Sequence, residues 1–490
     1  SSRWRLSLDA VRSERNAGRA AQAQHVACLH GMALMATDSL PVMGARMRDQ
    51  VLEPLEAQVE DLGLCHLKHQ SKALRAYRLH KPHKLGRIAS HDGRPSLALL
   101  APMAMSDSPV HRAFGALLVD RVSHQLGRSR HIRLVHPLSS RHLTGRSQAL
   151  QEACHWLAAD HVLQGSYRII GEHLQGSMEL RLSLHDMRQG VKVWEQAFRA
   201  SVGDVLSSDS ELTHAVSTGV HHAVLNAHID WVAQEPLRHL DDYSLLLVGV
   251  GLMHRSAPDD FDLSRRALVA LLERAPSMGQ AHAWLAKWHV LRVTRALTQQ
   301  PQQDADVAEA HAQQAALASD ARGLAQAMQG FVRLHLRRDL PGALDRLRAC
   351  TQEHPNEPLA WLFRGVAEAF ADQGSEALQA SQQALQLSPL DPLLYYFESL
   401  AASSALVCED AALARRWCEQ SLRRNLMHLH THRAYIAALV QQGDLAAARM
   451  AAGQLHKLAP GYTVAHFVRN GSSAETCLLY TSPSPRDATL

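Results

Sequence analysis

The sequence predicts a multidomain protein in which α/β regions come first and an all-α array of helical repeats follows. Three observations predict this class. The chain has 490 residues, enough for about three domains. Near residue 180, apolar residues alternate with polar ones, which is the period of a strand with one buried face. From about residue 207 the spacing becomes helical, and related segments recur about every 34 residues.

The composition excludes several classes of protein. With 46% apolar and 20% charged residues, the chain is not disordered as a whole. Its net charge of +4 is too small to indicate a nucleic-acid partner. The longest apolar run, Ser244–Met253, is about half of what a membrane span needs. The cysteines form no Cys-x-x-Cys pair, which favours a reducing compartment and a cytoplasmic location; they are Cys28, Cys65, Cys154, Cys350, Cys408, Cys418 and Cys477.

Residues 1–80 mix short strands and helices around the motif VEDLGLCHLKHQSKALRAYRL, which runs from Val59 to Leu79. With the preceding ARMRDQVLEPLEAQ (Ala45–Gln58), this motif resembles the last strand-helix-strand segment of class III nucleotide cyclase domains. The resemblance implies that residues 1–80 are the C-terminal remnant of an adenylate cyclase domain. It also implies ATP, Mg²⁺ or Mn²⁺, and a homodimer for a full-length member of the family. Because the chain has no initiator Met, we expect it to be a fragment of such a protein.

The cyclase remnant lacks the residues that carry the family's chemistry. Class III cyclases hold two metal ions on two Asp residues, because a 3′-hydroxyl must lose its proton beside a triphosphate. In the family both carboxylates precede the segment present here, and Asp9, Asp38 and Asp49 are single and wrongly placed. We therefore expect no catalytic, cofactor-binding or metal-binding residue in this chain.

The family's transition-state arginine is also missing. It follows an Asn by four residues, a spacing that places both side chains on one helix face. The corresponding positions here are Gln24 and Cys28, or His25 and Leu29 one register on. Neither choice supplies an arginine, and losing a cation from such a site costs several kcal/mol of barrier. Whether the chain is an enzyme therefore stays open, and we expect it to be inactive as it stands.

Residues 81–95 are rich in Pro, Gly and charge and predict a linker. Residues 96–205 then predict a small α/β module. It has a buried strand SLALLAPM, a helix over His111–Leu126, a strand HIRLVHP, a helix over Ser147–Ala159 and a hairpin that starts at HVLQGSYRII. In the next strand Met178, Leu180, Leu182 and Leu184 alternate with polar residues. This stretch resembles the TolB-like N-terminal module that joins cyclases and winged-helix regulators to tetratricopeptide arrays.

Residues 206–470 predict the helical repeats. ALDRLRACTQEHPNEPLAWLFRG starts at Ala343 and ALQASQQALQLSPLDPLLYYFES starts 34 residues later, at Ala377. Two helices and a Pro-marked turn at this period indicate tetratricopeptide repeats, whose units bury their apolar faces by stacking. We expect five or six helix pairs over Leu240–Val468, with Ala377 in the first helix of its unit and Gln382 on an exposed face.

The order of cyclase, TolB-like module and repeats resembles bacterial signalling proteins. It implies the regulatory portion of an adenylate cyclase-like protein, with repeats that bind a protein or peptide partner. The alternative is a non-enzymatic tetratricopeptide scaffold or regulator. The end of the chain does not continue the repeat, and we expect residues 471–490 to be disordered or artefactual. Within them Cys477–Leu490 resembles translated sequencing-adapter read-through, so it is excluded from the fold.

Two further patterns have a functional and a structural interpretation. His428 and His432 lie on one helix face, with His430 opposite, and could be a zinc pair; without a third ligand, a cluster on the repeat surface is favoured. Residues Arg121–Arg146 hold six Arg and four His and could bind phosphates. They span a helix, a strand and a loop, so a solvated surface is favoured.

The array itself contains two more such patterns. Trp284 and Trp288 share a helix face, and core packing is favoured over a peptide groove. The segment around Gly249 and Gly251 predicts a closely packed buried helix, because no Lys-Ser/Thr follows as in a phosphate loop.

Overall fold

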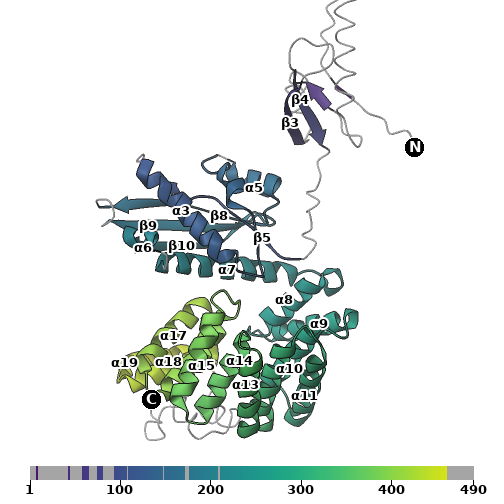
Figure 1. Cartoon of the computed structure of the whole chain (residues 1–490), viewed down its shortest axis with the longest axis vertical. Helices are drawn as coiled ribbons and strands as arrows, with labels where there is room; N and C mark the ends of the chain where they lie inside the picture. The colour runs from purple at the N-terminus through teal and green to yellow at the C-terminus, as the bar shows by residue number, and fades with distance from the viewer. Residues whose placement is uncertain are drawn as a thin grey trace, which may run out of the picture. The chain divides into compact units, whose positions relative to one another are not determined.

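The computed structural model describes residues 7–8, 42–44, 58–65, 74–80, 93–106, 109–146, 148–171, 176–207, 210–255 and 257–460. The chain divides into two compact units, Ser1–Ala89 and Ser90–Leu490 (Figure 1). The boundaries expected from the sequence within these units remain predictions. Within the described ranges, no helix is long and apolar enough to cross a membrane.

The first unit contains a four-stranded sheet in the order β1-β2-β4-β3. β1 (Ser7–Leu8) runs parallel to β2 (Val42–Gly44), and β4 (Leu74–His80) runs antiparallel to both β2 and β3 (Gln58–Cys65). β3 and β4 are the two ends of the cyclase-like motif. The segment between them lies outside the described residues, as do the positions weighed for catalysis: Asp9, Gln24, His25, Cys28, Leu29, Asp38 and Asp49.

The second unit opens with a mixed sheet in the order β10-β9-β8-β5-β7, with β6 (Met103–Ala104) paired to β8. β5 (Ser96–Leu99) runs parallel to β7 (Arg133–Leu134) and to β8 (His161–Ile170). β8, β9 (Ser177–Asp186) and β10 (Val191–Ser201) form an antiparallel meander. The four alternating apolar residues of β9 are each at most 1% exposed, which confirms the predicted buried face.

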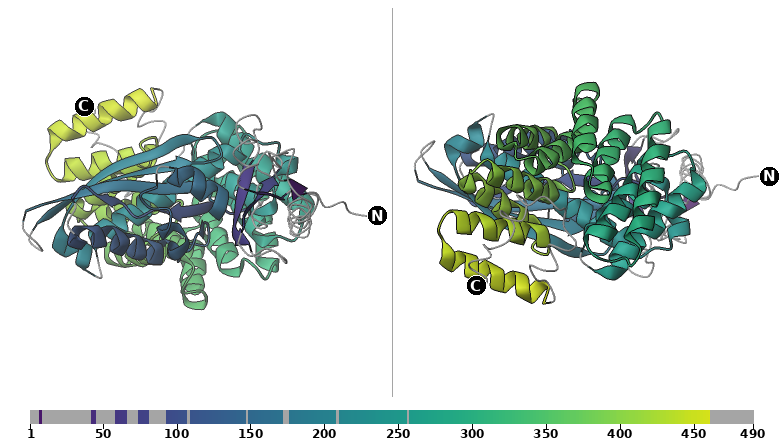
Figure 2. Two further views of the ribbon diagram at one scale, coloured as in Figure 1. Left: turned by 90° about the horizontal axis from the view of Figure 1, so that it is seen from above. Right: turned by 90° about the horizontal axis from the view of Figure 1, so that it is seen from below.

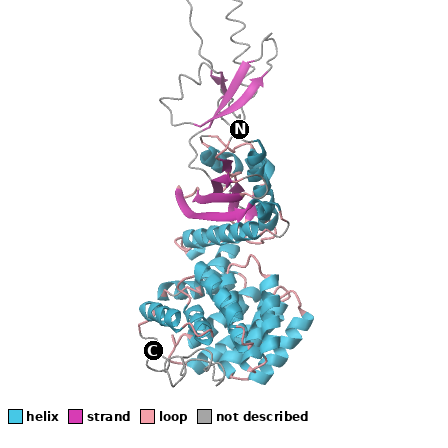
Figure 3. Ribbon diagram, turned by 90° about the vertical axis from the view of Figure 1, so that its left-hand side faces the viewer, coloured by secondary structure: helices cyan, strands magenta, loops and turns pink. Residues whose placement is uncertain are grey.

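Helices cover both faces of this sheet. α3 (Pro109–Leu126) and the long α7 (Glu211–Val232) bury Leu118, Val122 and Val216 against the side chains of β5, β8 and β9. α5 (Ala149–Leu157) packs on the other face, next to α4 (Pro137–Arg141). The short α6 (Val202–Leu206) leads into α7, which lies between the sheet and the helical array (Figure 3).

Twelve helices, which follow a short 3-10 turn at Leu237–His239, form the helical array in the described part of the chain (Figures 1 and 2). They pair in chain order into hairpins, from α8 with α9 to α18 with α19. They are α8 (Asp242–Leu252), α9 (Pro258–Arg274), α10 (Gly279–Thr294), α11 (Pro301–Leu317), α12 (Arg322–Val332, continued by a π turn over Arg333–Arg337), α13 (Leu340–Glu353), α14 (Pro358–Phe370), α15 (Gly374–Leu387), α16 (Leu394–Val407), α17 (Ala411–Arg424), α18 (Leu429–Gln441) and α19 (Leu445–Leu458).

The hairpins are built on a repeated turn. A residue with left-handed backbone joins the two helices at Arg338, Asp372, Glu409 and Gly443. Arg338 and Asp372 are 34 residues apart, as are Glu409 and Gly443. The array is therefore a tetratricopeptide-like solenoid, as the sequence period predicted.

The predicted frame of the repeat is wrong by one helix. α15, which contains Ala377, is the second helix of the hairpin α14/α15, not the first helix of its unit. The tight turn at Asp372 joins α14 to α15, and Gly365 of α14 lies directly against Ser381 and the backbone of Ala377. The Pro-marked turns that set the predicted frame lie between hairpins. Ala377 is nevertheless fully buried and Gln382 is exposed, as expected.

Candidate functional site: a polar pocket between α9, α10 and α11

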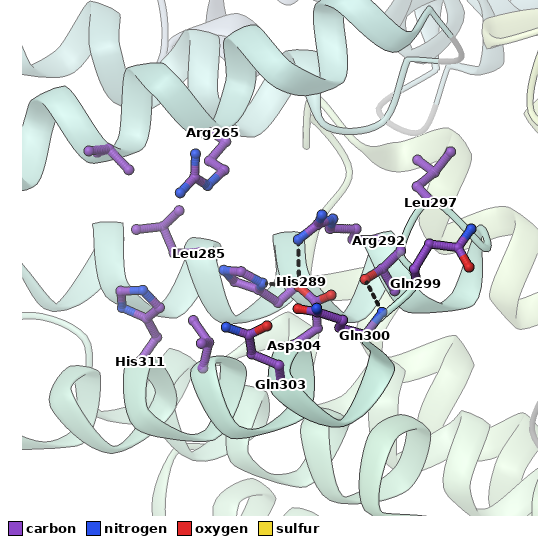
Figure 4. Close-up of a pocket in the computed structure, with 13 residues that line it drawn as sticks. Arg265, Leu285, His289, Arg292, Leu297, Gln299, Gln300, Gln303, Asp304 and His311 are labelled. Atoms are coloured by element: carbon purple, nitrogen blue, oxygen red, sulfur yellow. Dashed lines mark hydrogen bonds and ion pairs between the residues drawn. The ribbon is translucent and has the colours of Figure 1, made fainter.

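A pocket of about 450 Å³ lies between α9, α10 and α11 (Figure 4). This volume is in the range that small ligands occupy. Three helices and one loop supply its walls, and most of its side chains are polar or charged. They are Arg265 and Val269 of α9; Leu285, His289 and Arg292 of α10; Leu297, Thr298, Gln299 and Gln300 of the loop; and Gln303, Asp304, Val307 and His311 of α11.

Asp304 is the anchor of this pocket. Its side chain is buried, and Oδ1 accepts hydrogen bonds from His289 Nδ1 at 2.6 Å and from Arg292 at 3.1 Å. Burial by itself raises the pKa of Asp304, but hydrogen bonds from Thr298 and His289 and the charge of Arg292 outweigh it and lower the pKa. The carboxylate is therefore ionised and fixes the orientation of the His289 ring.

The imidazole of His289 is neutral and has a defined tautomer. Burial lowers its pKa, although the hydrogen bond to Asp304 opposes this, and the charges of Arg265 and Arg292 lower it further. An ionised carboxylate can only accept hydrogen bonds, so His289 Nδ1 carries the hydrogen. Its Nε2 therefore keeps a free lone pair.

His311 has the same tautomer for a different reason. Burial, together with His282, His289 and Arg265, lowers its pKa to about 4. His282 Nε2 lies 3.1 Å from the carbonyl oxygen of Pro276, which can only accept. With the Nε2 hydrogen of His282 directed at this oxygen, we assign His282 Nδ1 as the acceptor and His311 Nδ1 as the donor of the hydrogen bond between them, at 2.8 Å. His311 Nε2 is thus a second acceptor, on a ring centred 6.1 Å from that of His289.

Arg265 carries a positive charge that no carboxylate in the pocket lining neutralises. Its side chain extends from α9 toward His289 and His311 (Figure 4), and its guanidinium carbon lies 5.7 Å from the ring centroid of Trp288. Within the described ranges it forms no ion pair with a carboxylate. Since Arg292 offsets Asp304 and the imidazoles are neutral, the pocket keeps one positive charge. This uncompensated charge makes the pocket suited to binding an anion.

The inner face of the solenoid is filled by the chain itself. Lys287 of α10 is fully buried, and its Nζ lies 4.1 Å from the ring centroid of Tyr396 of α16 and 5.6 Å from that of Phe363 of α14. Burial lowers the pKa of this lysine to about 7, against the raising effect of Asp391. Helices far apart in sequence therefore meet across the superhelix.

Trp288 lies in the core, stacked on Phe261 at 4.6 Å, and its Nε1 donates to the Phe261 carbonyl oxygen at 2.9 Å. Core packing is confirmed for this residue. Trp284 is half-buried, and its ring centroid lies 5.1 Å from Lys287 Nζ. For Trp284 the choice between core packing and a peptide groove stays a prediction.

Of the three histidines at the start of α18, His432 is buried and His428 and His430 are half-buried, so the expected surface cluster is only partly exposed. His432 is buried, with Nε2 donating to the Leu426 carbonyl oxygen at 2.7 Å. The His428 ring packs edge-on against Tyr395 at 5.4 Å, and its centroid lies 6.2 Å from that of His430. In the described part of the chain, no group of three His, Cys, Asp or Glu residues is placed to hold a metal ion.

Three of the six arginines between residues 121 and 146 are engaged by groups of the protein itself. Arg141 pairs with Asp120 at 2.7 Å, Arg146 pairs with Glu152 at 3.0 Å, and Arg121 donates to the Leu206 carbonyl oxygen. The ion pairs are at the surface, where each contributes little to stability. The prediction for the glycines of α8 is confirmed, since a Cβ at Gly249 would lie 2.5 Å from Leu268 Cγ.

Sequence reasoning did not single out the pocket residues. His289 and Asp304 are on different helices and belong to no recognised motif. One available signal was the spacing of His282 and His289, seven residues apart and therefore close to one face of α10. That signal does not reveal which residue on a neighbouring helix faces them.

No family model and no curated protein matches this chain. Among solved structures, the chain is similar to a thermophilic TPR protein of Thermus thermophilus, at 18% identity over 41% of this chain and 100% of that one, with a TM-score of 0.32. PilF of Pseudomonas aeruginosa is 17% identical over 46% of this chain and 95% of its own, with a TM-score of 0.31. TolB of Acinetobacter baumannii is 12% identical over 34% of this chain and 31% of its own, with a TM-score of 0.19. Because these scores are low, the class of protein rests on the hairpins themselves: a tetratricopeptide-like solenoid joined to a small α/β module.

Proposed function

We propose that this chain is a non-enzymatic interaction scaffold or regulator whose helical repeats bind a protein or peptide partner. The observation that carries the proposal is the recurrence of the hairpin turn at Arg338, Asp372, Glu409 and Gly443. Stacked units of this kind offer a long continuous surface to an extended partner. Lys287 and Tyr396 fill the inner face, so the partner surface is expected on another side of the stack.

Leu426 and Met427 support a location for that surface. They are adjacent in the turn before α18 and are 62% and 47% exposed. Neighbouring exposed apolar side chains at a helix start are a frequent component of protein interfaces. The pair lies in a turn, so replacing it leaves the packed helices intact.

A peptide selection tests the proposal. Peptides from a random displayed library would be selected on the full chain, and their affinities measured by fluorescence anisotropy. We expect saturable binding with a Kd below about 100 μM, weakened at least tenfold by the double change Leu426→Ser with Met427→Ser. The matched control is Leu317→Ser, which removes an 80% exposed leucine on another hairpin and should leave the affinity unchanged. Failure to enrich any peptide would contradict the scaffold function.

The cyclase resemblance supports a finer proposal, in which the chain is the regulatory portion of a cytoplasmic, homodimeric adenylate cyclase-like protein. Its support is the motif at Val59–Leu79, whose ends pair as antiparallel strands with Glu60 opposite Arg78. The residues present do not fit the metal site of that family, since the sequence offers no suitable Asp pair. A further strand of the type D-[IL]-x-G-[FY]-[ST] upstream, with a second Asp about 40 residues later, would favour this proposal.

The two proposals share one prediction on activity. Purified residues 1–476 should not convert ATP into cyclic AMP with Mg²⁺ or Mn²⁺, because the metal-binding Asp pair and the transition-state Arg are missing. Cyclic AMP formation above background that a chelator abolishes would show that this chain is an enzyme.

A further inference from the structure

The pocket between α9, α10 and α11 is separate from the proposed partner surface, and its side chains define a ligand of their own. We propose that it binds a small organic monocarboxylate that carries a hydroxyl group next to the carboxylate. Such a site would make the scaffold responsive to a metabolite, because the ligand would contact both helices of the second hairpin and α9 of the first.

The carboxylate is assigned to Arg265. A guanidinium offers two parallel N–H donors that match the two oxygens of a carboxylate. Arg292 already donates to Asp304, whereas Arg265 has no carboxylate partner within the described ranges. One uncompensated positive charge matches a monoanion better than inorganic phosphate, which carries between one and two negative charges at neutral pH.

The hydroxyl is assigned to one of the two imidazoles, which offer it alternative acceptors. His289 and His311 each present an unprotonated Nε2, because their Nδ1 hydrogens are committed to Asp304 and to His282. A carboxylate cannot donate to these acceptors, but a hydroxyl on the neighbouring carbon carries one hydrogen and can donate it to either of them. A metal ion is the other group that two imidazole nitrogens could hold, but the charge of Arg265 opposes a cation here.

The rest of the ligand is apolar. Val269, Leu285, Leu297 and Val307 line the pocket together with the polar groups. At about 450 Å³ the pocket is larger than a hydroxyl-bearing carboxylate group alone, so a ring or branched alkyl group fits beside these side chains. Removing this apolar surface from water contributes to affinity in proportion to the area buried.

Calorimetric titration of the full chain with four matched compounds tests the assignment. Mandelate contains the acid, the hydroxyl and a ring; phenylacetate lacks the hydroxyl, methyl mandelate lacks the charge, and inorganic phosphate lacks the apolar body. We expect mandelate to bind one per chain and phenylacetate at least about tenfold more weakly, since phenylacetate leaves the imidazole acceptor unpaired. Methyl mandelate and phosphate should not bind measurably.

Two variants and one control locate the ligand. Arg265→Gln should weaken mandelate binding at least about tenfold, because it removes the ionic partner. Arg266→Gln is the matched control, since Arg266 is the next residue, is exposed and pairs with Asp262 at 3.3 Å. His311→Leu should reduce the preference for mandelate over phenylacetate while binding of the carboxylate persists. Circular dichroism would verify that each variant is folded.

Several outcomes would overturn the proposal. They are equal affinity of mandelate for the Arg265→Gln and Arg266→Gln proteins, tighter binding of phosphate than of mandelate, and equal binding of mandelate and phenylacetate. The absence of binding by both mandelate and the smaller lactate at about 10 mM would also overturn it. An acidic peptide that binds through Arg265 in place of these acids would assign the pocket to a partner protein instead.

Discussion

Replacing Gly365 by alanine tests the joint between α14 and α15. A Cβ at this position would lie 2.5 Å from Ser381 Oγ and 2.9 Å from the carbonyl oxygen of Ala377. The serine could rotate, but it would then lose its 2.8 Å hydrogen bond to Ser404, which links α15 to α16. The carbonyl of Ala377 belongs to the backbone of α15, so the two helices must separate by a few tenths of an ångström.

The expected change in the free energy of unfolding combines three contributions. Overpacking costs about 1–3 kcal/mol. The buried hydroxyls of Ser381 and Ser404, if separated, cost about 1–3 kcal/mol more. Alanine in place of glycine within a helix returns about 1 kcal/mol. We therefore expect a net loss of about 1–5 kcal/mol in the free energy of unfolding.

Urea unfolding of the full chain, followed by circular dichroism at the helix band, measures this change. The matched control is Gly453→Ala in α19, where no atom lies within 4 Å of the new Cβ. This substitution should stabilise its helix by about 0.5–1 kcal/mol, so the two glycine variants should differ in sign. Midpoints that rise together would show that α14 and α15 are not in close contact at Gly365.

Three further predictions concern packing, pH and the linker. Ala377→Phe should lower the free energy of unfolding, measured in urea, by about 1–3 kcal/mol, because Ala377 is fully buried. Gln382→Phe, on the exposed face of the same helix, should change it by less than about 0.5 kcal/mol. Burial lowers the pKa of His254 well below its usual value, so below about pH 6.5 the unfolded state takes up a proton there and the folded state does not. The free energy of unfolding should therefore fall by about 2 kcal/mol between pH 7 and pH 5 because of this residue. The variant His254→Leu should remove that fall. The control His456→Leu, at an exposed site, should leave it unchanged. Limited proteolysis should cut first within residues 81–95 and leave a stable fragment that begins near residue 95.

Each of these has a contrary result. Equal melting of the two phenylalanine variants would show that the faces of α15 are assigned wrongly. An unchanged dependence of stability on pH in His254→Leu would show that this histidine is protonated in the folded protein. First cleavage within residues 240–470 would contradict the linker.

Features that depend on local periodicity could be predicted from the sequence. The alternation in β9 gives its buried face directly, because successive side chains point to opposite sides of a strand. The run Ser244–Met253 is apolar on all sides, and α8 is accordingly packed against both α7 and α9. Ala377 and Gln382 were assigned to the correct faces because one helix pattern determines both.

The pairing of helices could not be read in the same way. Pro355 and Pro389 mark conspicuous turns, but those turns separate hairpins, whereas the turns within hairpins carry Asp372 and Glu409. These residues adopt the left-handed conformation that usually favours glycine, at a cost that the packed helices offset. Of the four turn residues named above, Gly443 alone is of a type that predicts a left-handed conformation from the sequence. A prediction that takes the prolines as the turns within repeats therefore pairs the second helix of each hairpin with the first helix of the next one.

The pocket and the filled inner face depend on how the hairpins stack. Lys287 meets Tyr396 because the superhelix brings α10 and α16 together, and no periodicity within either helix specifies that contact. The same holds for the pocket, where Asp304 of α11 orients His289 of α10 while Arg265 arrives from α9. Each side chain alone fits an ordinary polar helix surface. Together they place one free positive charge beside two imidazole acceptors, and this combination exists only when α9, α10 and α11 are packed together. A ligand of this kind would therefore recognise the stacking of the first two hairpins rather than any single segment.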